Sequence, residues 1–177
     1  EILDRRIGEN ELAAIQASLA YVDAQREYYW SNPDAAPMLH YASNLVSAPG
    51  KKDGLFWESA EDEAPSPLGE LFAAARSEGY LLDGTAQPVP YYGYHFHILT
   101  AQGEHAAGGA YDYVVGDRMI GGFGLVAYPA ERGTSGVMTF IVNHDGVVFS
   151  KDLGENTTKL AVEMTTFDPD DSWKREE

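Results

Sequence analysis

The sequence predicts an α+β fold in which a long N-terminal amphipathic helix packs on an antiparallel β-meander of four or five strands. Apolar side chains in residues 11–30 recur three and four positions apart, which is the spacing of one helix face. From Tyr91 onward the period changes to two, and aromatic and β-branched residues alternate in runs separated by glycine. A one-faced helix and a sheet bury their apolar surfaces by packing against each other.

The N-terminal helix is predicted to span residues 11–30. Asn10 can cap it, Glu11 suits the positive end of the helix dipole, and Pro33 closes the segment because it restricts the residue before it. The stripe expected to face the sheet consists of Leu12, Ile15, Leu19, Val22, Arg26 and Tyr29.

An irregular connection is predicted over residues 31–65, which hold several prolines and an acidic cluster. A second helix is predicted over 67–78. Ser66 is its expected cap, Pro67 occupies its first position, and Gly79 terminates it.

The antiparallel sheet is predicted within residues 91–151. Its strands follow each other too closely for crossover helices, so neighbouring strands must run antiparallel. A short helix at 155–164 and a polar tail at 168–177 complete what we expect to be a single domain, 1–177. The five expected strands lie near 93–101, 110–116, 121–128, 136–143 and 147–151.

Composition limits the classes of partner. The chain has 177 residues, of which 44% are hydrophobic, enough for one substantial core. Its 12 basic and 28 acidic residues give a net charge of −16, which repels nucleic acid and anionic membranes and favours calcium or a basic protein. The absence of cysteine excludes disulfides and thiolate metal sites. No apolar run is long enough to span a membrane, and a start at Glu1 instead of methionine indicates a processed or trimmed piece.

Two histidines and several aspartates are the candidate metal ligands. His95 and His97 share one strand face, but the opposite face carries the apolar residues, so we expect a polar face and no metal there. The segment from Asn143 resembles part of a calcium loop, although a hairpin turn at Asp145-Gly146 explains it better. We expect no bound cofactor, and calcium is the one candidate. Its ligands would be either Asp145 and Asp152 or Asp168, Asp170 and Asp171.

Catalytic patterns are weak. Ser135, His144 and Asp145 supply the residue types of a hydrolytic triad, but a loop and a hairpin tip explain them better. Acidic pairs are abundant, and most are expected to be solvated surface. A carbohydrate-stacking face is a further hypothesis, built from Trp30, Trp57, Tyr91, Tyr92, Tyr94, Tyr111 and Tyr113.

Motifs along nearly the whole chain resemble one family. They are LAYVDAQREY at 19–28, PGKKDGLFW at 49–57, SPLG at 66–69, and the stretches 93–103, 110–113 and 136–154. This combination resembles the bacterial secreted family of unknown function DUF2950. The resemblance implies an extracytoplasmic protein, in the periplasm or at the cell surface, made with a signal peptide and a further region upstream. It implies no catalytic residues.

The order of elements also resembles the globular part of a type IV pilin or pseudopilin, as an architectural analogy. The leading functional hypothesis is therefore a non-enzymatic envelope or surface module, with self-association or an envelope protein as partner. Two alternatives stay open: a hydrolase or sugar-processing enzyme that uses surface carboxylates, and a calcium-dependent binding module.

Overall fold

The computed structural model describes residues 1–71, 73 and 90–177. Most of the predicted helix 67–78, including its terminator Gly79, lies outside these residues. Residues 69–71 are helical, in agreement with the prediction. No helix of the described part is both long and apolar enough to cross a membrane.

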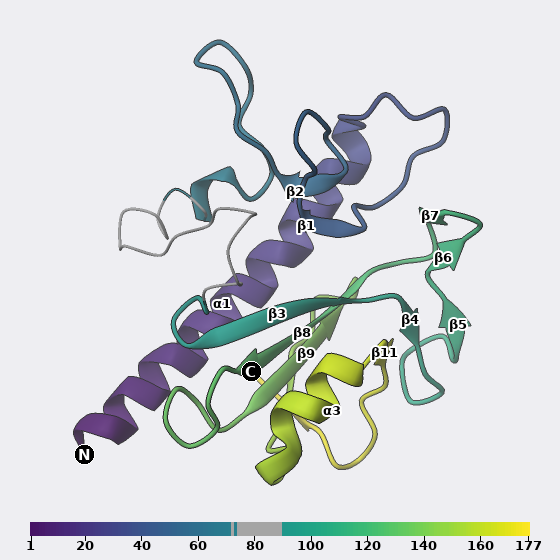
Figure 1. Ribbon diagram of the computed structural model, residues 1–177. Helices are drawn as coiled ribbons and strands as arrows, with labels where there is room; N and C mark the ends of the chain where they lie inside the picture. The colour runs from purple at the N-terminus through teal and green to yellow at the C-terminus, as the bar shows by residue number, and fades with distance from the viewer. Residues whose placement is uncertain (72, 74–89) are drawn as a thin grey trace.

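A five-stranded antiparallel sheet lies between two helices (Figure 1). Helix α1 (Ile2–Ser31) crosses one face, and helix α3 (Thr157–Glu163) covers the other. The predicted α+β class, with an N-terminal helix packed on an antiparallel sheet, is confirmed. The strands, in spatial order, are β12 (Lys174–Arg175), β10 (Phe149–Lys151), β9 (Thr139–Asn143), β8 (Gly124–Pro129) and β3 (Tyr94–Leu99).

Both faces of this sheet are buried. One apolar core lies between the sheet and α1, and a second lies between the sheet and α3. All five residues of β9 are buried, because the side chains that point away from α1 meet the second core. The sequence predicted a helix over one face only, so the second layer is a finding of the structure.

Helix α1 begins earlier than predicted, and the face that it buries overlaps the predicted stripe at Val22 but not at Leu12 or Leu19. Asn10 lies inside the helix, where its amide Nδ2 donates to the carbonyl of Ser135 at 2.8 Å, so it is not a cap. Leu12 and Leu19, predicted to be buried, are 56% and 40% exposed. Small side chains let the helix approach the sheet closely. The face that packs inward contains Ala14, Ala17, Ser18, Tyr21, Ala24, Gln25 and Tyr28.

The predicted strand 110–116 leaves the main sheet. Between β3 and β8 the chain forms short strands on the side of the molecule, and Gln102 organises their turn by donating to the carbonyls of Ala107 and Gly109, each at 2.8 Å. Gly108 and Gly109 have positive φ angles, which turn the chain away from the sheet. These strands are β4 (Ala101–Gln102), β5 (Tyr111–Asp112), β6 (Val114–Val115) and β7 (Arg118–Met119), and β11 (Thr166–Phe167) pairs with β4.

Two segments predicted to be irregular contain strands. The connection 31–65 forms the parallel pair β1 (Asn44–Val46) and β2 (Gly54–Phe56). The expected polar tail, 168–177, carries the edge strand β12, which pairs with β10. The predicted short helix at 155–164 is present as η1 (Gly154–Asn156) and α3, and the turn at Gly146 is also present.

Candidate functional site

Three tyrosines gather beside the C-terminal end of α1, where β8 begins and β9 ends. The rings of Tyr29 and Tyr41 lie 4.8 Å apart at an interplanar angle of 30°. Tyr111, 38% exposed, lies within electrostatic range of the Tyr41 hydroxyl. Arg26 and Asp145 bring one charge of each sign to the same region. These five residues are called the tyrosine surface below.

Tyr41 is held from two sides. Its backbone N–H donates to the carbonyl of Met119 at 2.8 Å, and its ring packs edge-on against Phe123 with the centroids 4.8 Å apart. The next residue, Ala42, is fully buried and is bound by the side chain of Gln25. The amide of Gln25 donates to the Ala42 carbonyl and accepts from the Ala42 N–H, both at 2.8 Å.

Tyr111 is held by its own hydroxyl, which donates to the carbonyl of Gly121 at 3.1 Å. Its ring contacts the buried Tyr113 edge-on, with 5.6 Å between the centroids. Tyr113 in turn donates to Gln102 Oε1 at 3.0 Å, so a buried polar network supports this side of the surface.

The electrostatics keep the phenols neutral. Burial raises the pKa of Tyr41, as does the nearby hydroxyl of Tyr29, while Arg26 opposes this shift. Burial also raises the pKa of Tyr111, and the carboxylate of Asp145 adds to the increase. At neutral pH Tyr41 and Tyr111 therefore carry neutral hydroxyls, which can donate and accept hydrogen bonds.

His144 lies beneath this surface. Its ring contacts Tyr113 and Phe123 edge-on, and its backbone carbonyl accepts a 3.1 Å hydrogen bond from Arg26. The Nε2 atom of His144 is 4.0 Å from Asp145 Oδ1. His144 thus links the guanidinium and the carboxylate of the tyrosine surface to the aromatic core.

The histidines of β3 lie on one face, as predicted. That face was expected to be polar, but it is half-buried. The Nε2 atom of His97 is 2.9 Å from the carbonyl of Met164, which follows α3. His95 packs against the ring of Tyr128, and burial lowers its pKa. Among the described residues, no group of three or more His, Cys, Asp or Glu side chains is arranged to hold a metal ion.

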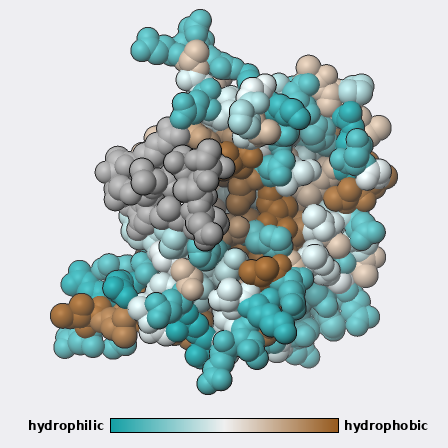
Figure 2. All heavy atoms as spheres, in the orientation of Figure 1, coloured by the Kyte–Doolittle hydropathy of each residue, from teal (hydrophilic) through white to brown (hydrophobic). Residues whose placement is uncertain are grey.

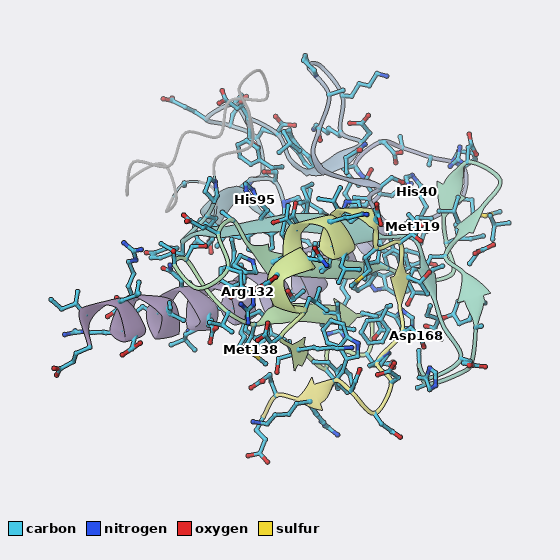
Figure 3. All side chains as sticks on the ribbon, turned by 60° about the horizontal axis from the view of Figure 1, so that its bottom comes forward. His40, His95, Met119, Arg132, Met138 and Asp168 are labelled. Atoms are coloured by element: carbon cyan, nitrogen blue, oxygen red, sulfur yellow. The ribbon has the colours of Figure 1, made fainter. Side chains whose placement is uncertain are left out.

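The calcium candidates have protein partners. Asp152 receives two hydrogen bonds from Arg132, at 2.7 and 2.6 Å, and these lower its pKa to about 2. Asp168 Oδ1 accepts from the backbone N–H of His105 and lies 3.0 Å from its Nδ1. Figure 3 shows Arg132 and Asp168 well apart, so the carboxylates of Asp152 and Asp168 belong to different parts of the surface.

The Asp170 carboxylate accepts from the backbone N–H of Ser172 at 2.8 Å, and its pKa is lowered chiefly by hydrogen bonds from that serine. Asp145 lies on the tyrosine surface, away from the end of the sheet that holds Ser135. The hydroxyl of Ser135 bonds to the backbone of Glu131 in the β8–β9 loop. Ser135 precedes β9 and His144 follows it, so the two residues lie toward opposite ends of this strand and do not form the pair that a triad requires.

The predicted aromatic face divides between core and surface. Tyr94 and Tyr113 are fully buried, whereas Trp30 and Tyr111 are exposed. Tyr29 and Arg26 were expected in the buried stripe of α1, and Tyr41 fell in the irregular connection, so the sequence did not assign them to a site. The run of three aromatic residues at 28–30 was the available signal.

The model of one family, described as Protein of unknown function (DUF2950), matches residues 1–176. The chain belongs to this family. The resemblance inferred from its motifs is thereby confirmed, although the description names no reaction, ligand or partner. No curated protein matches the chain, and neither does any solved structure.

Proposed function

We propose that this chain is a non-enzymatic, extracytoplasmic module of the bacterial envelope that binds a neutral saccharide on the tyrosine surface. The observation that carries the proposal is the tilted pair of rings Tyr29–Tyr41, with centroids 4.8 Å apart, beside Tyr111 and a pair of opposite charges. Aromatic rings with a polar edge bind ligands that have both an apolar face and hydroxyl groups.

The charges of the site suit a neutral sugar. Sugar hydroxyls can accept from the guanidinium of Arg26 and donate to the carboxylate of Asp145, while a C–H face lies on a tyrosine ring. The net charge of −16 disfavours polyanionic glycans, because like charges repel.

The behaviour of the carboxylates supports binding over catalysis. A glycosidase needs one carboxyl group whose pKa is raised, so that it can act as an acid. In the described part of the chain, the carboxylates with a resolved shift, Glu63, Asp152 and Asp170, have lowered pKa values, because hydrogen bonds stabilise their charged forms.

The test is a titration of the protein with oligomers of glucose and of N-acetylglucosamine, followed by the amide and aromatic signals in NMR spectra. We expect the signals of the tyrosine surface to shift, and Tyr111→Ala to weaken binding at least tenfold. Leu160→Ala is the matched control, because Leu160 is exposed on α3 on the opposite side of the sheet. Shifts scattered over the whole protein, or equal binding by Tyr111→Ala, would refute the assignment. Release of shorter sugars during the titration would instead favour the enzyme hypothesis.

A specific observation also favours a role as a subunit of a larger assembly, as in the pilin analogy. The exposed Leu12 and Leu19 form an apolar stripe on α1 that faces away from the sheet. Sedimentation should then show oligomers that dissociate at low salt, where the net charge is least screened, and in the Leu12→Ser variant. A monomer at every salt concentration contradicts this role. The extracytoplasmic location is tested by fractionating cells that make the natural protein and finding which fraction contains it.

A further inference from the structure

Strand β3 forms one edge of the main sheet, and no described strand pairs with its outer side. Among the described strands only β8 pairs with it, through the antiparallel register His95↔Tyr128 and His97↔Val126. On the other side, the Tyr94 backbone exchanges two hydrogen bonds with Tyr91, at 2.9 and 3.0 Å. Tyr94 thus directs its N–H and C=O groups away from β8.

The open stretch follows from the alternation of the strand. In an antiparallel ladder, every second residue directs both backbone groups to the same side. Phe96 and Ile98 therefore share the outward direction of Tyr94. Thr100 has the same phase, and its N–H and C=O are bonded to Thr165 and Tyr113. Between the bonded residues Tyr94 and Thr100, the N–H and C=O groups of Phe96 and Ile98 point outward, which makes four backbone groups.

The residues of β3 itself include none of the side chains that commonly guard such an edge. Exposed sheet edges in natural proteins are commonly guarded by lysine, proline or inward-pointing charges. Residues 94–99 contain no Asp, Glu, Lys, Arg or Pro. Figure 2 shows apolar surface extending from the β1–β2 pair toward β3, and Val46 of β1 is 41% exposed.

We propose that the open edge of β3 takes up an extended, positively charged peptide segment of a partner protein by strand addition. The backbone groups of Phe96 and Ile98 supply the hydrogen bonds, and the apolar surface toward β1 receives alternate side chains of the peptide. A second copy fits this edge less well, because both chains would bring a net charge of −16. The same charge attracts a basic segment. This inference uses residues outside the tyrosine surface and does not depend on the proposed saccharide.

The experiment uses the full chain and a seven-residue synthetic peptide that alternates lysine with valine. We expect the amide hydrogens of Phe96 and Ile98 to exchange at least tenfold more slowly when the peptide is saturating. The amides of His95 and His97, which already face β8, are internal controls and should change little.

Three control peptides test the mode of binding, and two of them carry N-methyl groups on alternate residues, one on the odd and one on the even positions. The peptide whose N-methyl groups face β3 cannot form the ladder, and we expect its affinity to fall at least tenfold. A peptide with glutamate in place of lysine should bind at least tenfold more weakly because of the charge. Equal binding of the N-methylated peptides in both phases, or unchanged exchange at Phe96 and Ile98, overturns the proposal.

A variant tests the edge itself. Ile98→Pro removes one outward N–H without removing a bond to β8, and proline is tolerated at such edge positions. We expect the variant to lose peptide binding at least tenfold with its far-UV circular dichroism unchanged. If the variant does not fold, the control peptides on the unaltered chain still test whether the peptide binds to β3 by strand addition. A dimer that protects Phe96 and Ile98 without any peptide would assign the edge to a second copy and overturn the proposal.

Discussion

The side chain of Gln25 offers the sharpest test of how this fold supports its surface. Gln25 is fully buried on α1, and its amide satisfies both backbone groups of Ala42, the residue that follows Tyr41. Its Nε2 atom also donates to the hydroxyl of Tyr21 at 3.1 Å. Replacement with leucine keeps a similar volume and removes these bonds.

The magnitude follows from the groups left behind. A buried donor or acceptor without a partner costs about 1–3 kcal/mol, and Gln25→Leu leaves one of each on Ala42. The two groups together cost about 2–6 kcal/mol, and leucine offsets part of this by gaining apolar burial, so we expect a loss of about 3 kcal/mol in the free energy of unfolding. Since small domains are stable by only about 5–15 kcal/mol, this is a large fraction.

Urea unfolding, followed by fluorescence and far-UV circular dichroism, measures the change. Gln16→Leu is the matched control, because Gln16 is exposed on the same helix, and its effect should stay within about 0.5 kcal/mol. A loss below about 1 kcal/mol in Gln25→Leu would refute the reasoning, because it would mean that the Ala42 backbone finds other partners. The NMR signals of Tyr41 should move in Gln25→Leu and stay in place in the control.

Three further outcomes are expected. Glu11→Ala should lower the free energy of unfolding by about 1–2 kcal/mol, because the carboxylate accepts two backbone N–H groups of the β8–β9 loop, whereas the exposed Glu27→Ala should change it little. The pKa of Asp152 is lowered to about 2, so its charged form contributes stability that is complete above its unfolded pKa, near 4, and is lost as the pH falls toward 2. Asp152→Asn should therefore flatten the dependence of unfolding on pH in that window, and an unchanged slope would contradict the assignment. If calcium binds near Asp168 and Asp170, millimolar calcium should raise the melting temperature more than magnesium does, and no rise would remove the calcium hypothesis.

Patterns of neighbouring residues in the sequence correctly predicted the end of α1, the turn at Gly146 and the short helix near the C-terminus. The helix ends at Ser31 and the hairpin turns at Gly146 as expected, because Pro33 and the Asp-Gly pair constrain the chain through their own backbone chemistry. The short helix at 155–164 was found in the same way. For strands of two or three residues, such as β1 and β12, the alternating pattern is too short to be recognised.

The site was less accessible to sequence reasoning. Tyr41 and Tyr111 are 70 positions apart, and no spacing rule connects them. The aromatic residues at 28–30 mark the end of α1, but which of them is buried depends on the rotation of the helix on the sheet. The sequence also did not predict the partners of Asp152 and Asp168. Arg132 contacts Asp152 and His105 contacts Asp168 only in the folded chain.

By itself, the sequence determined the α+β class, the antiparallel pairing of the main sheet, the acidic character and the family, since each of these depends on residue order or composition alone. Only the tertiary structure decided which face of α1 is buried. The pattern favoured the stripe through Leu12 and Leu19, yet the helix buries the face with Ala14 and Ala24. The physical reason is that small side chains permit close approach to the sheet, and buried hydroxyl and amide groups such as those of Tyr21 and Gln25 find backbone partners that hydrophobicity cannot foresee.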